Sequence, residues 1–403
     1  MAIPALRDTG WLSGYIFLRW ALLFNLAIPC PGVAGTPPLQ IVYMAQEQEV
    51  PPALSNLDPI VTDKGIQGAR LAVEDNNTTG RFTGQAFALK EVIIPRGGDV
   101  AAPFRNLVAG GSRFFVTNLP AAVLRGLPHT DADDDFLIFD AATADDALRN
   151  QDCRAEVLHM LPSRAMRADA LAQYFLMKRW RDWFLVIGPA EEDRLFAAAL
   201  KRSAQRFGMR IVAERVWQHT HDARRTAQSE VPVFTQGVDY DILIVADEAG
   251  LFGEYLTYRT WLPRPVAGTQ GLVPTAWHRT HEQWGAVQLQ NRFLRQAGRW
   301  MGEQDYAAWL AVRAIGEAAT RTGSVEFDKI KAYLLSEDLA LAGFKGAKLS
   351  FRAWDGQLRQ PVLLAADRAL VTVAPIEGFL HPKNELDTLG YDAPESECKF
   401  SAR

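Results

Sequence analysis

The stretch WFLVIGPAEEDRLFAAALKRSAQRFGMRIVA, residues 183–213, decides the fold class. It begins with an uninterrupted apolar run, 183–187, which is typical of a strand that is buried on both faces. A helical pattern follows over 190–207 and ends at Gly208, and a second short apolar run occupies 210–213. A strand, a helix and a strand at this spacing predict a right-handed βαβ unit in a parallel sheet.

The same alternation runs through most of the chain. Short apolar runs that are rich in β-branched and aromatic residues predict strands at 41–45, 89–94, 113–117, 136–139, 183–187, 210–213, 242–245 and 265–267. Helical patterns lie between them, with Asp63 and Asp99 as the expected N-caps of the first two helices. Because the strands form two groups separated near residues 150–165, the sequence predicts an α/β protein with two doubly wound parallel sheets.

The C-terminal third follows a different pattern. Helical periodicity covers 305–322 and 325–335, and apolar alternation then covers 347–354 and 357–364. The intervening pair Asp355-Gly356 predicts a β-hairpin closed by a two-residue type I′ turn.

The N-terminus has the pattern of a secretory signal peptide. Arg7 and Arg19 precede a short apolar stretch, which small residues follow at 32–35. The alternative is a membrane anchor, but Arg19, Pro29 and Pro31 interrupt the apolar residues that would have to cross a bilayer. We expect residues 1–35 to be a signal peptide, cleaved near Ala34 or Gly35.

Charge and cysteine content narrow the class of protein. The chain of 403 residues has a net charge of −4 and no long basic run, which argues against nucleic-acid binding. Cleavage would remove Cys30 and leave Cys153 and Cys398. In an oxidising compartment, two remaining cysteines predict one disulfide, and two separate thiols are the alternative.

No catalytic or metal-binding motif stands out. The chain lacks the Gly-x-Ser-x-Gly elbow, the phosphate loop and the His-Glu-x-x-His helix. The close pairs His219/His221 and His278/His281 fit exposed loops better than zinc sites. Seven aspartates between 131 and 146 indicate a solvated loop, with a cation site as the alternative. We therefore expect no catalytic residue, no cofactor and no metal ligand.

Three segments carry a resemblance to a known family. Residues 64–84, KGIQGARLAVEDNNTTGRFTG, resemble the first βα unit of the type I periplasmic binding proteins, which include the Leu/Ile/Val-binding proteins. Residues 305–315 resemble the long late helix of these proteins, and 351–358 resemble their closing hairpin. More narrowly, 152–166 and the Cys-containing tail resemble the ABC-transporter substrate-binding proteins associated with pyrroloquinoline-quinone (PQQ)-dependent alcohol dehydrogenase systems.

The resemblance implies two α/β lobes joined by three hinge crossings, which close around a ligand. Lobe 1 would comprise 36–160 and 285–345, lobe 2 would comprise 161–284 and 346–395, and 396–403 would form a tail. The crossings would lie at 160–162, near 275–285 and just before residue 347.

Ligands of such folds bind beyond the carboxyl ends of the parallel strands. This rule selects a set of candidate ligand-binding residues from both lobes: Gln46, Glu47, Thr117, Asn118, Asp140, Ala141, Thr143, Gly188, Asp247, Glu248, Thr269 and Gln270. Amino-acid binders of the family present hydroxyls and free amides to a ligand carboxylate, whereas Asp140 would repel one. The sequence therefore predicts a neutral or cationic ligand, such as an alcohol-related metabolite or a metal ion.

The implied function is solute binding in the periplasm, as the receptor of an ABC transporter linked to PQQ-dependent alcohol oxidation. Its partners would be a small-molecule or ion ligand and a membrane permease, and we expect a monomer. One alternative is a periplasmic ligand or metal-ion sensor or chaperone of the dehydrogenase system that does not take part in transport. The other is an enzyme on an α/β scaffold, which the absence of a catalytic constellation disfavours.

Overall fold

A computed structural model describes residues 37–49, 60–129, 135–217 and 227–399. The predicted signal peptide lies outside the described residues, as do His219, His221 and part of the acidic cluster. None of the helices in the described part of the chain is long and apolar enough to cross a membrane.

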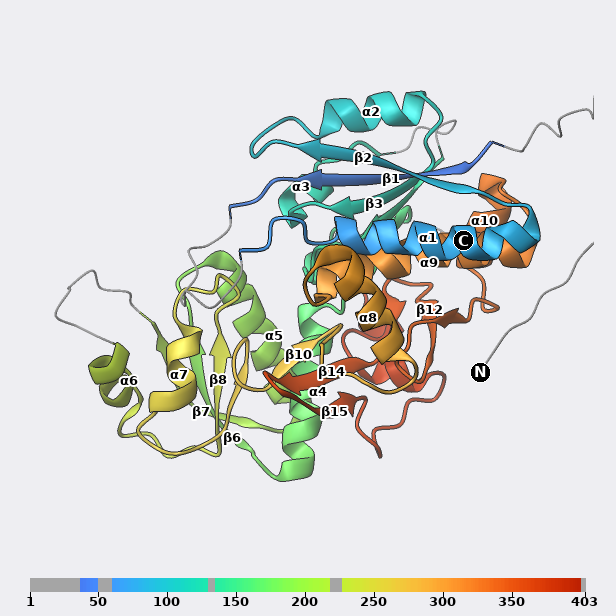
Figure 1. The fold of residues 1–403 in the computed structure, drawn as a ribbon. Coiled ribbons are helices and arrows are strands. Elements are labelled where there is room, and N and C mark those ends of the chain that lie inside the picture. Colours follow the sequence, from blue (N-terminus) through green and yellow to red (C-terminus); the bar gives the residue numbers. More distant parts are fainter. Residues whose placement is uncertain (1–36, 50–59, 130–134, 218–226, 400–403) are drawn as a thin grey trace, which may run out of the picture. The chain divides into compact units, whose positions relative to one another are not determined.

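The first sheet, sheet A, has five parallel strands in the order β2-β1-β3-β4-β5 (Figure 1). These strands are β1 (Leu39–Gln46), β2 (Phe87–Ile94), β3 (Phe114–Asn118), β4 (Leu137–Asp140) and β5 (Val157–His159). The four predicted strands of this sheet are confirmed. The edge strand β5 was missed, because its apolar run is only Val157-Leu158 before His159.

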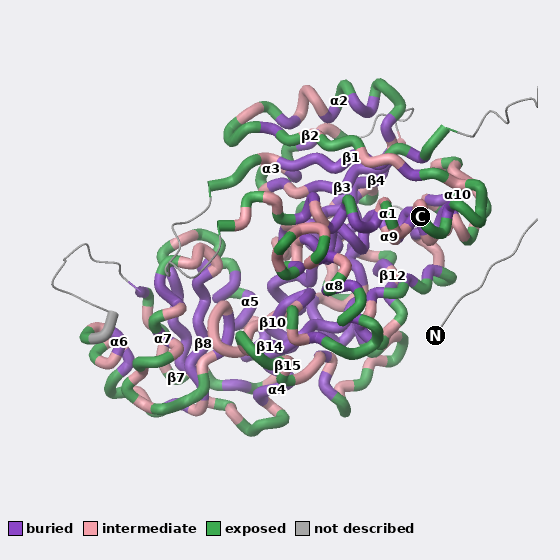
Figure 2. The backbone as a smooth tube through the Cα atoms, viewed as in Figure 1, coloured by how far each residue is buried: buried purple, intermediate pink, exposed green. Residues whose placement is uncertain are grey.

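Each face of sheet A packs against helices, as a doubly wound sheet requires. Alternate residues such as Tyr43 and Phe139 join the core beneath α1 (Ile66–Thr83) and α9 (Glu303–Thr322), while Met44 and Ile138 join the core beneath α2 (Ala101–Ala109). Figure 2 shows β1, β3 and β4 as largely buried segments, whereas β2 is more exposed. Three further helices complete this part of the chain: α3 (Ala121–Arg125), α8 (Ala286–Ala297) and α10 (Phe327–Leu334).

The second sheet, sheet B, has four parallel strands in the order β7-β6-β8-β9. These are β6 (Asp182–Ile187), β7 (Arg210–Val216), β8 (Ile242–Ala246) and β9 (Val266–Gly268), which confirms the four predicted strands. Leu185 and Ile244 face α4 (Arg164–Lys178) and α5 (Glu191–Phe207). Phe184 and Leu243 face the opposite core, beside α6 (Ala227–Thr235) and α7 (Gly253–Arg259).

The predicted C-terminal hairpin forms, but with a different turn. β12 (Lys348–Phe351) pairs with β13 (Leu358–Arg359), and Phe351 lies opposite Leu358, so six residues connect the strands. Of the predicted turn pair, only Gly356 has a positive φ, of 70°. Asp355 instead accepts a hydrogen bond from Gln357 N at 2.9 Å. The two-residue type I′ turn was therefore a wrong prediction.

The segment predicted as one strand after this turn contributes to two sheets. β13 stays with β12 and with β11 (Leu341–Ala342), whereas β14 (Val362–Ala366) pairs with β10 (Val273–Thr275) and β15 (Ala369–Ala374). Short 3₁₀ helices occupy Ala147–Arg149, Glu385–Thr388 and Ala393–Glu395. The lobe boundaries and the three crossings stay predictions.

The two predicted N-caps have different outcomes. The Asp99 carboxylate accepts a hydrogen bond from Ala101 N at 2.8 Å, which confirms its role at the start of α2. Asp63 does not cap α1, which begins after Gly65 without a side-chain cap. The Asp63 carboxylate instead binds Arg299 Nε at 2.9 Å, because Asp305 from α9 already accepts the Gly65 amide at 2.7 Å.

Cys153 and Cys398 form a disulfide, which confirms the predicted pairing. Their Cα atoms lie 5.7 Å apart although 245 positions separate them in the chain. The bond ties the C-terminal segment to the turn that leads into β5.

Candidate functional site

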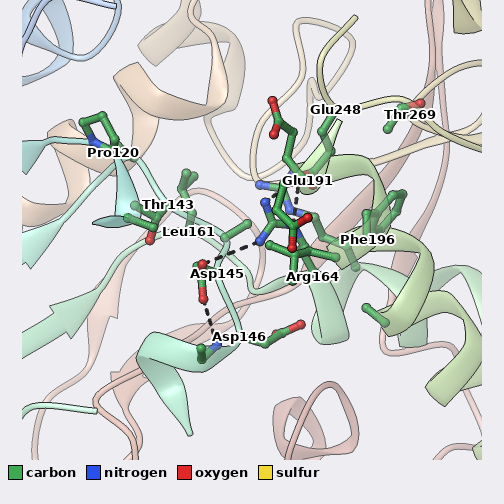
Figure 3. A pocket seen from close by; sticks show the side chains of 18 of the residues that line it. Pro120, Thr143, Asp145, Asp146, Leu161, Arg164, Glu191, Phe196, Glu248 and Thr269 are labelled. Carbon is green, nitrogen blue, oxygen red and sulfur yellow. Dashed lines mark hydrogen bonds and ion pairs between the residues drawn. The ribbon is translucent and has the colours of Figure 1, made fainter. Parts of the chain in front are cut away.

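A cavity of about 1260 Å³ lies where loops from both sheets meet (Figure 3). Sheet A contributes residues 119–122 after β3 and 142–147 after β4. Sheet B contributes Glu191 and Glu192 at the start of α5, Asp247 and Glu248 after β8, and residues 268–270 after β9. These are the carboxyl ends of parallel strands, where open α/β sheets bind ligands.

Five of the predicted ligand-binding residues line this cavity: Thr143, Asp247, Glu248, Thr269 and Gln270. The structure places the other predicted residues away from its wall: Gln46, Glu47, Thr117, Asn118, Asp140, Ala141 and Gly188. The rule about strand ends therefore selected loops that line the cavity, but it did not tell inward-facing residues from cavity-facing ones.

Each displaced residue has a structural reason. Gln46 Nε2 donates to Gly98 O at 3.0 Å, and Asn118 Nδ2 donates to Lys64 O at 2.9 Å. Both side-chain amides therefore bind backbone oxygens in the part of the chain around sheet A. Glu47 is exposed outside the cavity. Three further residues, Thr117, Asp140 and Ala141, are buried within the fold. Gly188 leaves room for the Asp193 carboxylate, which lies 2.1 Å from where a Cβ on that glycine would stand.

Asp140 is the main correction, because its predicted repulsion of a ligand carboxylate assumed that it faces the ligand. Its Oδ1 accepts hydrogen bonds from Ala142 N and Thr143 N, both at 3.1 Å, and its Oδ2 accepts one from Thr143 Oγ1 at 2.7 Å. His159 Nδ1 lies 2.9 Å from Oδ2, and Arg149 Nη2 lies 4.0 Å from it. Burial acts to raise the pKa of Asp140, but His159 and Arg149 lower it overall, so the carboxylate stays charged. Asp140 therefore shapes the loop from within.

Asp247 stabilises its own loop in the same way. Its carboxylate accepts hydrogen bonds from three successive amides after β8, at 2.6–3.0 Å: Leu251, Phe252 and Gly253. Asp247 N donates a hydrogen bond to Thr269 Oγ1 at 3.1 Å, which connects this loop to the one after β9. Both predicted residues line the cavity, and both also fix its backbone.

Arg164 is one of three arginines in the cavity wall. It is the first residue of α4, after the N-cap Ser163, whose Oγ accepts from Met166 N at 3.3 Å. Arg164 Nε and Nη2 donate to Glu248 Oε2 at 2.8 and 2.6 Å, and Nη1 lies 4.0 Å from Asp145 Oδ2 (Figure 3). Burial acts to lower the pKa of Arg164, but Glu248 raises it overall. The guanidinium thus connects the loop after β8 to the loop after β4.

A second arginine of α4 has a similar role. Arg167 Nη2 lies 3.0 Å from Glu303 Oε2, at the start of α9. The Glu303 carboxylate also accepts from Thr275 Oγ1 at 3.0 Å and from Ala276 N at 3.3 Å. Burial acts to raise the pKa of Glu303, but Arg167 and these donors lower it overall.

Sequence reasoning missed both arginines because it missed β5. The strand-end rule, applied after Val157–His159, would have selected the residues that lead into α4. α4 itself begins at Arg164. The local signal of β5 is only the apolar pair Val157-Leu158 before His159, which is too short to predict a strand by itself.

The described residues offer no group of three or more His, Cys, Asp or Glu side chains that could hold a metal ion. Asp145 and Asp146 of the acidic cluster do line the cavity. Their carboxylates accept the amides of Ala147 at 2.8 Å and of Ala165 at 3.1 Å.

Comparison with known proteins yields solved structures only. No protein-family model matches the chain, and no curated protein matches it either. A periplasmic binding protein from Burkholderia mallei superposes with a TM-score of 0.63 at 16% identity, over 90% of this chain and 98% of that one. A branched-chain amino acid ABC transporter periplasmic ligand-binding protein from Burkholderia xenovorans gives 0.62 at 16% identity, over 83% and 95%.

A third structure agrees with these two. The leucine-, isoleucine-, valine-, threonine- and alanine-binding protein from Brucella ovis, in a closed conformation, gives a TM-score of 0.62 at 14% identity, over 90% of this chain and 97% of that one. Identities this low establish the fold and nothing finer. The chain has the α/β fold of the type I periplasmic binding proteins.

Proposed function

We propose that this protein is the periplasmic solute-binding component of an ABC transporter and that it holds a small ligand in the cavity between its two sheets. The observation that carries the proposal is the cavity itself. It is large enough for a metabolite, and the carboxyl-end loops of both sheets line it. Its neighbours in fold include proteins described as ABC transporter ligand-binding proteins, which supports a receptor role.

Two features support a periplasmic location. The pattern of residues 1–35 is that of a secretory signal peptide, and the Cys153–Cys398 disulfide suits an oxidising compartment. Fold neighbours described as periplasmic binding proteins agree with this location.

The proposed link to PQQ-dependent alcohol oxidation rests on residues 152–166. In the structure this segment contains Cys153 of the disulfide, strand β5 and Arg164 of the cavity wall. Because this segment shapes both the fold and the cavity, we expect the sequence differences between subfamilies of this fold to fall within it. Affinity purification from cells grown on an alcohol tests the link: recovery of a permease favours transport, and recovery of a dehydrogenase alone favours a sensor or chaperone.

Ligand binding is tested by thermal unfolding of the protein from residue 36 onward, with a panel of neutral, cationic and anionic solutes. A ligand at one hundred times its Kd stabilises the native state by about 2.7 kcal/mol. In an Ala144→Trp variant the indole would occupy the cavity, and the stabilisation should disappear. Ala109→Trp, at an exposed position at the end of α2, is the matched control and should keep it. Equal stabilisation of both variants would contradict binding in this cavity.

A further inference from the structure

The loops around the cavity have already used many of their backbone amide donors. Asp140 accepts the amides of Ala142 and Thr143, and Asp247 accepts three amides of the loop after β8. Asp193, from the first turn of α5, accepts Ala190 N and Ala249 N, both at 3.1 Å. Backbone amides are the groups with which loops and helix N-termini bind anions. Here the protein's own carboxylates occupy them.

The positive side chains of the wall are paired as well. Arg164 binds Glu248 and Arg167 binds Glu303, as described above. The third arginine of the wall, Arg125, places Nε 2.7 Å from Asp152 Oδ2. Each of these guanidinium charges is therefore already balanced by a carboxylate of the protein.

Negative charge is in surplus. The cavity wall holds three arginines against seven carboxylates: Asp145, Asp146, Glu191, Glu192, Asp247, Glu248 and Glu303. Glu248 also keeps accepting capacity, because both of its bonds to Arg164 use Oε2. Its side chain is 21% exposed and lies on the cavity wall (Figure 3). The wall thus offers acceptors and negative charge.

We propose that the ligand is a small organic cation, a protonated or quaternary amine without a carboxylate, whose positive charge lies beside Glu248. The proposal rests on the solute-binding function above and names its ligand class. A cation suits this wall because it adds the missing positive charge and needs no donor from the protein. A carboxylate would meet uncompensated negative charge, with many of the loop amides already bonded.

The test is a calorimetric titration with sets of compounds that share a carbon skeleton and differ in charge. One set is 3-methylbutylamine, 3-methylbutanol, 4-methylpentanoate and leucine; further sets carry aromatic, guanidinium and trimethylammonium groups. We expect the amines of at least one set to bind ten times more tightly, or better, than their matched acid, amino acid and alcohol. Raising the salt concentration should weaken that binding, because exposed charges are screened.

A variant locates the charge. Glu248→Gln removes one negative charge and keeps an acceptor for Arg164, so affinity for the bound amine should fall at least tenfold. Glu214→Gln, at a surface residue whose partner is Lys201 at 2.8 Å, is the matched control and should bind as the parent does. Equal affinities of the Glu248→Gln and parent proteins would overturn the placement of the cation.

The outcomes separate this proposal from the function on which it rests. Preferential binding of an acid, an amino acid or an alcohol would overturn the cation proposal and leave solute binding in place. If no compound of any charge binds, and the protein isolated from its native periplasm releases no small molecule on denaturation, both proposals fail.

Discussion

Removal of the Cys153–Cys398 disulfide should destabilise the protein strongly while leaving its fold intact. The bond closes a loop across 245 positions of the chain. In the chain-entropy model a disulfide that closes a loop of 100 residues stabilises the folded state by about 4.7 kcal/mol, and this stabilisation rises only with the logarithm of the loop length. The same relation gives about 5.5 kcal/mol here, slightly above the range of about 0–5 kcal/mol that disulfides contribute.

The folded state should survive because other contacts hold the C-terminal segment. Arg206 Nη1 donates to Gly390 O at 2.7 Å, and Arg202 lies 4.1 Å from the centre of the Tyr391 ring. Beside the disulfide, Glu397 N donates to Asn150 Oδ1 at 2.6 Å. A Cys153→Ser, Cys398→Ser double variant should therefore keep the native circular dichroism spectrum and lose free energy of unfolding.

Urea unfolding followed by tryptophan fluorescence measures this loss. The double variant should unfold at a lower urea concentration, and its m-value should rise because the unfolded chain is no longer cross-linked. Parent protein kept in a reductant is the control and should behave like the double variant. If oxidised parent, reduced parent and variant share one midpoint, the cross-link adds nothing to stability and the reasoning is wrong.

Two further predictions concern the interior. Gly68→Ala should lower the free energy of unfolding far more than Gly84→Ala: a Cβ at Gly68 would stand 1.8 Å from the Asp305 carbonyl oxygen, whereas Gly84 has open space and only a positive φ of 71°. Chemical unfolding should show about 1 kcal/mol for Gly84→Ala, and a similar value for both variants would contradict the tight packing of α1 on α9. Burial raises the pKa of Asp355 to about 6, above its value in the unfolded chain. Between pH 4 and 6 the folded protein therefore binds more protons than the unfolded chain, so this group's contribution to stability should fall as pH rises through that range and then stay level. Asp355→Asn should remove that slope. Free energies of unfolding measured across this pH range would contradict the assignment if those of the parent and the variant change in parallel.

The sequence allowed the two sheets to be predicted because most of their strands contain a buried, apolar run. A run such as Ile242–Ala246 has one stable location, between two layers of helices, so its burial follows from its composition. β5 has only three residues, one of which is a histidine. Its place at the sheet edge depends on pairing with β4, which is a tertiary contact. Local patterns could not show it. The C-terminal hairpin was recognised for the opposite reason, since alternation and a turn residue are local signals.

The candidate site was harder to predict because a carboxylate at a strand end can turn either way. Asp140 and Glu248 both follow buried strands, yet Asp140 turns inward to His159 whereas Glu248 faces the cavity and Arg164. The difference lies in partners that are distant in sequence: Glu248 meets an arginine 84 positions away. Both residues are carboxylates at or just beyond a strand end, so the sequence could locate the loops but not the direction of their side chains.

The direction of Asp140, Asp193 and Asp247 also connects the structure of the loops to the ligand class proposed above. A loop that exposes bare amides at a strand end needs an anion to satisfy them, and a ligand carboxylate can be that anion. Where the chain supplies Asp140, Asp193 and Asp247 instead, the loops keep their shape without a ligand. The same carboxylates leave few amides for an anionic ligand. What stays open to a ligand is then the acceptor capacity of Glu248 beside Arg164, so selectivity in this cavity should follow the positive charge of the ligand.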